Sequence, residues 1–528
     1  MRRPSSHSLL HWARHLGVPV DDLDPTQLRE DLSAGTIPQA LGRAAEQHGD
    51  STLTVDDERC TLAALELDVR RRAGTLAGMS IGKGQRVVIH APSSLSMVTS
   101  YLAVLATGAT AVLTNPGYTE GELAATVHRA GATLVLGDAP AASSSSSAAT
   151  LTLVDLANQS IDAPPLEDPG TTPEDVALLA FTSGTTGEPK GVPLTHAHLL
   201  ASIRGAMWSW RWSPSDVLVH ALPLFHQHGL SGLHATLVAG SSASIISRFD
   251  AEALLTRIDE AGGTIMFGVP ATHRRFLELP TDRLEPLRRL RLVTSGSGPL
   301  SPALAQAFRS TTGVTLLERY GLTESGLDVS NTYDGDRPPG RVGTSLPGVE
   351  VELRESDGSP TPLGQSGEIV LHGPQIFEGY LNNPEATEES FWPGGWFRTG
   401  DLGRWDDEDR LEITGRLKDL VITGGMNVSP VEVESVIEQL PEAREAAVAG
   451  LPSERWGEEV AAWVVPEGDS KLDTDRIVAY CREHLAAYKC PKHVFRIDAL
   501  PRNHMGKVVR GDLTAPDGST DAGTEARE

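Results

Sequence analysis

The segment of this chain with the most evident capacity for chemistry is a run rich in Gly, Ser and Thr that follows an apolar stretch. Residues 180–191 read AFTSGTTGEPKG. The glycines let the backbone approach a ligand closely, the hydroxyl and amide groups can donate hydrogen bonds to phosphate oxygens, and Lys190 supplies a cation. The Walker A spacing, GxxxxGKS or GxxxxGKT, is absent. An ordinary turn would explain any three of these residues, but the whole run in this order indicates a phosphate-binding loop.

Four further motifs follow this loop. They are YGLTE at 320–324, TGD at 399–401, GRLKD at 415–419 and PRNHMGK at 501–507. With these motifs in this order, the sequence resembles the acyl-adenylate-forming superfamily of acyl-CoA synthetases, luciferases and peptide-synthetase adenylation domains. The resemblance covers about residues 37–512. It implies that the chain uses ATP to activate a small carboxylic acid as its acyl-adenylate and then passes the acyl group to coenzyme A.

The first step in this family brings a carboxylate against the α-phosphate of ATP, so cations must neutralise the meeting of two anions. The resemblance implies that Lys507 contacts both anions, that Thr186 is a further catalytic group and that Glu324 holds Mg²⁺. It also implies that Asp401 accepts hydrogen bonds from the ribose hydroxyls and that Arg416 adds a donor. The other ATP-binding residues it implies are Thr182, Ser183, Gly184, Thr185, Gly187, Lys190, Ser297, Glu318, Arg319, Tyr320 and Thr323.

Members of this family use one site for both steps by rotating a small domain about a hinge, which the motif places at Lys418. After the rotation Lys507 would leave the site. The turn of Gly424, Gly425 and Met426 would then face the nucleophile and line the channel for coenzyme A. A plain hairpin turn explains the paired glycines almost as well.

Three segments resemble malonyl-CoA synthetases and bear on the choice of acid. They are LFHQHGL at 224–230, GVPATHRR at 268–275 and SNTYDGDR at 330–337. A second carboxylate on the substrate would need a cation, and His226 and Arg275 are the candidates by family position, next to the substrate-binding Ser295 and Gly296. The alternative is that Arg275 lies on a solvated helix face and that His226 is a core histidine. Several residues differ from the family pattern, which leaves room for another acid: Gln227, Ala271, Thr272 and His273.

Other functions remain to be compared with this one. An amine, a separate carrier-protein thiol or another nucleophile could replace coenzyme A, since no fused carrier domain is evident. An inactive nucleotide-binding scaffold would be expected to have lost Lys507, Glu324 or the phosphate loop, and all three are present. A dinucleotide-dependent oxidoreductase is disfavoured because no GxGxxG follows a strand with an acidic residue at the expected distance.

The elements that must position these residues have an α/β pattern, with short β-branched runs alternating with Ala/Leu-rich stretches from Ile37 onward. We therefore predict a large multi-subdomain adenylation domain at 37–417 and a small mobile α+β domain at 418–514. An extension at 1–36 and a disordered tail at 515–528 complete the predicted organisation. Residues 429–432 predict a capping box that opens a helix. The strand candidates are 86–90, 133–136, 176–181, 264–268, 290–294 and 314–318.

Composition excludes several other classes. A formal charge of -25 over 528 residues disfavours binding to nucleic acid or to anionic lipid. The three cysteines are too few and too scattered for a disulfide framework. The apolar stretch near residues 101–113 is too short to span a bilayer, and no secretory leader is evident, so we predict a soluble cytoplasmic protein.

Overall fold

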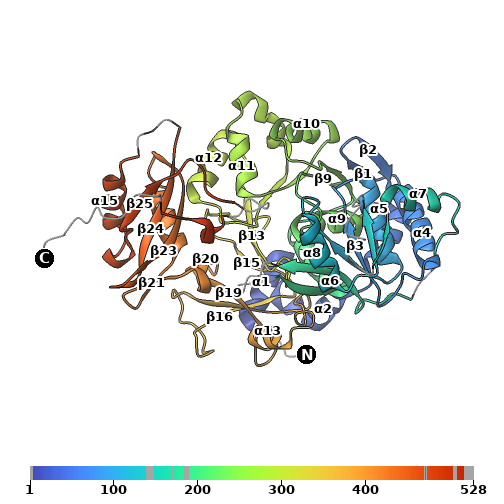
Figure 1. Ribbon diagram of the computed structural model, residues 1–528, viewed down its shortest axis with the longest axis horizontal. Helices are drawn as coiled ribbons and strands as arrows, with labels where there is room; N and C mark the ends of the chain where they lie inside the picture. The colour runs from blue at the N-terminus through green and yellow to red at the C-terminus, as the bar shows by residue number, and fades with distance from the viewer. Residues whose placement is uncertain are drawn as a thin grey trace.

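A computed structural model describes residues 4–137, 148–167, 170–182, 189–468, 470, 472–502 and 508–515 of the chain. Three sheets and their helices form a large domain, and a fourth sheet lies in a small C-terminal domain. Figure 1 shows the small domain, coloured orange to red, at one end of the molecule, and the part of the large domain that contains β1 (Thr52–Val55) and α4 (Leu62–Gly78) at the opposite end. The predicted α/β class with a large N-terminal and a smaller C-terminal domain is confirmed.

The first sheet contains the strand that leads into the phosphate loop. Its strand order is β6-β5-β3-β4-β7-β8, and pairing is parallel except between β7 and β8. The strands are β3 Arg86–His90, β4 Thr110–Leu113, β5 Leu134–Gly137, β6 Ala149–Leu151, β7 Val176–Thr182 and β8 Lys190–Thr195. Its helices are α4 Leu62–Gly78, α5 Leu95–Ala106, α6 Glu120–Ala130 and α7 Leu153–Ser160. Helix α5 is apolar and is buried from Met97 to Ala106. None of the described helices is both long and apolar enough to cross a bilayer.

The second sheet has the order β15-β14-β13-β12-β11-β9-β10-β1-β2, with parallel pairing from β13 to β1. Parallel strands end at one edge, so the ends of β11, β12 and β13 meet there. The strands are β1 Thr52–Val55, β2 Glu58–Thr61, β9 Val217–His220, β10 Ser242–Ile245, β11 Ile265–Gly268, β12 Leu292–Ser295, β13 Leu317–Tyr320, β14 Val329–Ser330 and β15 Thr344–Ser345. The accompanying helices are α8 His196–Ser209, α9 Gln227–Ala239, α10 Ala251–Ala261, α11 Pro270–Leu277 and α12 Pro302–Thr312.

The third sheet leads to the small domain, which has its own sheet and its own apolar core, including Val433, Ile437, Val464 and Ile477. The third sheet comprises β16 Glu350–Arg354, β17 Gly367–His372, β18 Phe391–Trp392, β19 Trp396–Trp405 and β20 Leu411–Arg416, with α13 Pro384–Glu389 beside it. The small domain comprises β21 Val421–Thr423, β22 Met426–Val428, α14 Pro430–Ile437, β23 Ala443–Ser453, β24 Gly457–Pro466, α15 Thr474–His484 and β25 His493–Arg496. Short 3-10 turns are η1 Val20–Asp22, η2 Thr281–Arg289, η3 Leu417–Asp419, η4 Ala487–Lys489 and η5 Arg510–Asp512.

The predicted strands are all present, with ends shifted by no more than three residues. The predicted capping box at Ser429 is wrong. The Ser429 hydroxyl donates to the backbone carbonyl of Thr414 instead of capping α14, and it thereby joins the small domain to β20.

The segment before Ile37 contains two helices, α1 Ser6–Leu16 and α2 Pro25–Ser33, which the sequence pattern did not predict. Trp12 of α1 is fully buried and donates to the carbonyl of Val349, and Arg29 of α2 forms a buried ion pair with Glu350 at 3.0 Å. The buried face of α1 is formed largely by Ser and His, so it lacks the aliphatic periodicity that marks an amphipathic helix.

Candidate active site

The phosphate loop connects the antiparallel strands β7 and β8, in which Thr182 pairs with Lys190. This register sets both residues at the mouth of the loop. Lys190 Nζ lies 4.8 Å from the centre of the Tyr380 ring. Some predicted site residues lie outside the described part of the chain: Ser183, Gly184, Thr185, Thr186, Gly187 and Lys507.

Glu324 contacts the hydroxyl group of the same tyrosine. Its carboxylate accepts a hydrogen bond from Tyr380 Oη at 3.0 Å, and burial raises the pKa of Glu324. Tyr380 therefore joins Lys190 to the predicted magnesium ligand, although sequence reasoning did not identify it. The only sequence signal was its place in an aromatic and Gly-containing turn at 377–380. Thr323, before Glu324, is half-buried in the turn that follows β13.

The predicted ribose end is an assembled hydrogen-bonded group. Asp401 on β19 lies opposite Arg416 on β20, and their nearest atoms, Arg416 Nε and Asp401 Oδ1, are 2.5 Å apart. Tyr320 Oη donates to the other carboxylate oxygen at 2.7 Å. The Asp401 side chain is 4% exposed. Three residues predicted separately are therefore brought together, and each charge in the group has a partner.

The loop after β12 forms the opposite end of the site. Gly296 lies directly against the guanidinium of Arg319, and a Cβ at Gly296 would be 2.4 Å from Arg319 Nε. Ser297 is exposed, has a φ of 63° and holds its hydroxyl 3.0 Å from His228 Nδ1. A non-glycine residue in this left-handed conformation is uncommon and is often found at functional sites.

Several buried polar atoms around this loop have no hydrogen-bond partner among the described residues. They are His220 Nε2, His228 Nε2, Thr294 Oγ1, Ser295 Oγ and Arg319 Nη2. His220 and His228 both lie against the ring of Phe267, at 6.3 and 5.6 Å between ring centres. We name Arg319, His228, His220 and Ser295 the acid-end cluster.

The acid-end cluster combines a fixed cation with neutral imidazoles. Burial lowers the pKa of Arg319 to about 10, so the guanidinium stays charged at neutral pH. Burial and the nearby Arg319 hold the pKa of His228 well below its ordinary value. Asp328 is the carboxylate that interacts with Arg319, but burial raises its pKa to about 7, so it offsets that charge only in part. Unpaired buried polar groups are costly, and this cluster offers its donors to an anion.

Glu318, the neighbour of Arg319, contacts the backbone of a different segment, at Gly340. Its carboxyl accepts a hydrogen bond from the backbone of Gly340 at 2.9 Å, and burial raises its pKa to about 8.

The two residues predicted to clamp a second carboxylate belong to different elements, His226 at the start of α9 and Arg275 in α11. His226 is half-buried at the start of α9, with its ring 4.4 Å from that of Phe225. Arg275 is in the last turn of α11 with 63% of its side chain exposed, and it pairs with Glu278 at 2.5 Å. Its neighbour Arg274 instead contacts the small domain, with Nε 3.2 Å from Glu445. A clamp that includes Arg275 would require it to leave Glu278.

The predicted hinge residue and the glycine turn both follow β20, the last strand of the third sheet. Lys418 is exposed in η3, between β20 and β21. Gly424 and Gly425 have φ values of 57° and 78° and form a two-residue hairpin turn, which only glycine adopts readily at both positions. Met426, next in the chain, is 46% exposed.

Comparison with known proteins gives consistent results. Residues 41–381 match the family model of the AMP-binding enzyme, and residues 432–507 match that of the AMP-binding enzyme C-terminal domain. Oxalate–CoA ligase of Arabidopsis thaliana is 33% identical over 91% of this chain and 98% of its own. The mitochondrial malonate–CoA ligase ACSF3 of Mus musculus is 36% identical over 64% of each chain. The crystal structure of ATP-bound MatB from Rhodopseudomonas palustris is 35% identical, covers 90% of this chain and 97% of its own, and has a TM-score of 0.84.

Proposed function

Because this chain belongs to the AMP-binding enzyme family and is an acid–CoA ligase of its acyl-CoA synthetase branch, we propose that its acid is a small dicarboxylate such as malonate. The observation that carries this proposal is the acid-end cluster, in which the charged Arg319 is buried with an unpaired Nη2 beside the substrate loop. A distal carboxylate would supply the missing acceptor and the missing charge.

The position of Arg319 also bears on the length of the acid. Its guanidinium fills the space against Gly296, and the ring of Phe267 lies beside His228. A long or aromatic acyl group would have to displace a buried cation or leave it without an anion, and either costs free energy. Two relatives are named for the dicarboxylates oxalate and malonate, while others of similar identity are named for coumarate and ferulate, so the acid must be decided by experiment.

The described residues divide the work of adenylation between two ends of the site. Asp401 orients the ribose by accepting hydrogen bonds from its hydroxyl groups. Arg416 holds the Asp401 carboxylate in place and offers a further hydrogen-bond donor. Lys190 adds positive charge where the phosphates arrive. Glu324 is a buried carboxylate held by Tyr380 and fits a magnesium ligand; the ion would neutralise phosphate charge. Lys507 is proposed to contact the two reacting anions.

Coenzyme A is proposed as the acceptor, and the turn at Gly424 supports this assignment. Beside the turn, Trp456 is 38% exposed. Lys492 Nζ lies 4.7 Å and Arg455 Cζ 4.9 Å from the centre of its ring. An aromatic face flanked by cations suits a ligand that combines a nucleotide with phosphates. Rotation about Lys418 would bring this surface to the acyl-adenylate. A separate carrier-protein thiol is the alternative acceptor.

The test is pyrophosphate release with malonate, methylmalonate, oxalate, propionate and benzoate, each with and without coenzyme A, with products identified by mass spectrometry. The proposal predicts that dicarboxylates are preferred by at least tenfold in kcat/KM and that the matching CoA thioester forms. Preference for propionate or benzoate would overturn the assignment of the acid. Adenylate without thioester would overturn coenzyme A, and no release with any acid would favour an inactive scaffold.

A further inference from the structure

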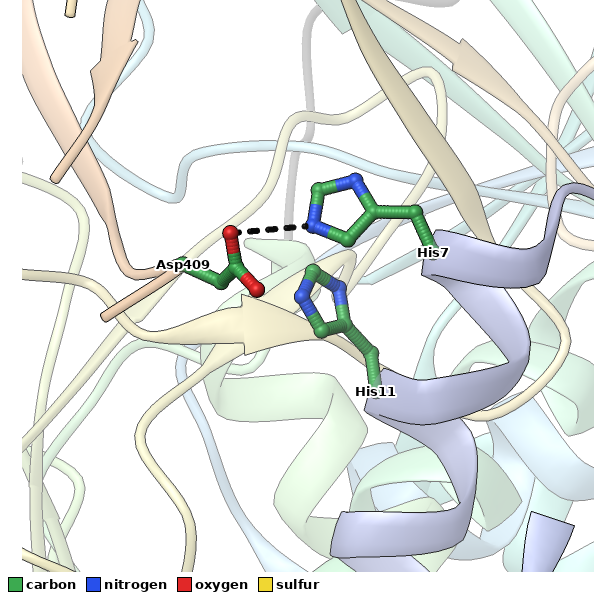
Figure 2. Close-up of side chains that lie close together, drawn as sticks. All are labelled: His7, His11 and Asp409. Carbon is green, nitrogen blue, oxygen red and sulfur yellow. Dashed lines mark ion pairs between the residues drawn. The ribbon is translucent and has the colours of Figure 1, made fainter. Parts of the chain in front are cut away.

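Three side chains with metal-ligand chemistry meet where α1 packs against the turn between β19 and β20, at the other end of this hairpin from Asp401 and Arg416. Figure 2 shows that the rings of His7 and His11 and the carboxylate of Asp409 point toward one another. One ligand atom of each lies within 4.8 Å of those of the other two. His7 Nε2 is 3.6 Å from Asp409 Oδ1, and the two rings are 4.3 Å apart between centres.

The two histidines are held in place by their surroundings. They are four residues apart on one helix and therefore lie on the same face. His11 is 2% exposed, and its Nε2 is buried without a hydrogen-bond partner in the described part of the chain. Its Nδ1 lies 3.1 Å from Ser345 Oγ and accepts a hydrogen bond from the backbone N–H of Ser345 at 3.4 Å. A metal ion at Nε2 would therefore require the other tautomer, in which Nδ1 carries the proton and donates to Ser345 Oγ. Trp405 packs against both rings, at 5.3 and 5.5 Å between centres.

We propose that His7, His11 and Asp409 bind a Zn²⁺ ion, with a fourth position open to water. Two imidazoles and one carboxylate suit zinc, whereas Mg²⁺ and Ca²⁺ prefer oxygen ligands throughout. Zinc bonds of about 2.0–2.2 Å would set the ligand atoms roughly 3.4 Å apart, so the side chains must close by about 1 Å. His7 and Asp409 can do so because their side chains are 38% and 47% exposed. Asp409 already occupies a turn conformation with a φ of 59°.

Such a site would fasten the N-terminal helix to the hairpin of β19 and β20. Asp401 and Arg416 pair at the opposite end of this hairpin, and Lys418 follows it. The ion would therefore stabilise the large domain without entering the reaction.

The site can be tested with the full chain after chelation and dialysis. Co²⁺ is titrated while visible d–d absorption is recorded, Zn²⁺ is added in competition, and thermal unfolding is followed with and without Zn²⁺. We expect one equivalent of Zn²⁺ to displace Co²⁺ from a four-coordinate spectrum and to raise the Tm by several degrees. His7→Gln and Asp409→Asn should each weaken Zn²⁺ binding at least tenfold while leaving pyrophosphate release unchanged.

The matched control is Asp407→Asn, which removes the same charge from an exposed position in the same turn and should bind Zn²⁺ as the unaltered chain does. Asn is tolerated in the left-handed conformation at 409, so Asp409→Asn is expected to fold normally. Equal Zn²⁺ affinity in the unaltered chain, His7→Gln and Asp409→Asn would overturn the proposal. A Zn²⁺-dependent rise in Tm that persists when His7→Gln and Asp409→Asn are combined in one chain would also overturn the proposal, because zinc would then act elsewhere.

Discussion

The two ends of the active site differ in how their charges are satisfied. At the ribose end, Asp401 is already paired with Arg416 and hydrogen-bonded to Tyr320. At the acid end, Arg319, His228 and Ser295 keep buried polar atoms without partners among the described residues. The first end is organised by the protein itself, whereas the second depends on its ligand for the missing partner. If the proposed function holds, nucleotide binding uses a prebuilt group, and the choice of acid depends on compensating a buried cation.

The largest effect is expected at the ribose end. Asp401→Ala would leave Arg416 partly buried without its carboxylate and remove the acceptor of the ribose hydroxyls. We expect kcat/KM for ATP to fall roughly a thousandfold, or about 4 kcal/mol, in a pyrophosphate-release assay. Glu412→Gln alters the pairs that the more exposed Glu412 makes with Arg404 and Arg341, and it should change this value less than twofold. A loss below tenfold for Asp401→Ala would show that the prebuilt group is not needed.

The second prediction concerns pH and the carboxyl group that interacts with Arg319. Burial raises the pKa of Asp328 to about 7 from its ordinary 3.8, so folding favours the protonated form. Its contribution to stability is complete below pH 4 and is lost as the pH rises through about 7. Asp328→Asn should remove this loss, so its free energy of unfolding should exceed that of the unaltered chain by roughly 4 kcal/mol at pH 8 but by only about 2 kcal/mol at pH 5.

Urea unfolding at pH 5, 6, 7 and 8 measures this difference directly. The KM for malonate should also rise above pH 7 in the unaltered chain, because ionised Asp328 would then neutralise Arg319, and it should stay flat in Asp328→Asn. Parallel pH curves for the two proteins would contradict both expectations.

The third prediction addresses Arg319 itself. Arg319→Met keeps much of the side-chain volume and removes the charge, so kcat/KM for malonate should fall about a hundredfold while that for propionate changes a few-fold. The free energy of unfolding should be unchanged or higher, because an unpaired buried cation is removed. Arg275→Met is the matched control, since that arginine is exposed and paired with Glu278. A malonate-selective loss in Arg275→Met instead would favour the clamp predicted from the sequence.

Local sequence patterns predicted much of the fold, and the failures have physical causes. The strands at 86–90 and 176–181 were predicted because they are short apolar runs that contain β-branched residues. Helix α1 was missed because its buried face consists largely of Ser and His, and the partners of the two buried histidines, Ser345 and Thr344, are far away in the chain. Ser429 had the sequence of a cap but bonds to Thr414 instead, since a nearby carbonyl competes for its hydroxyl.

The sequence by itself determined the chemistry, because the order of the phosphate loop and the motifs around Glu324, Asp401 and Arg416 is a property of the chain alone. Only the tertiary structure decided which arginine is buried beside the predicted substrate-binding residues. Arg319 and Arg275 are equally charged in the sequence, but one is buried beside Gly296 and the other is exposed beside Glu278. It also decided that His11 meets Asp409, nearly four hundred residues along the chain. Burial and pairing depend on distances between remote residues, and these arise only when the chain folds.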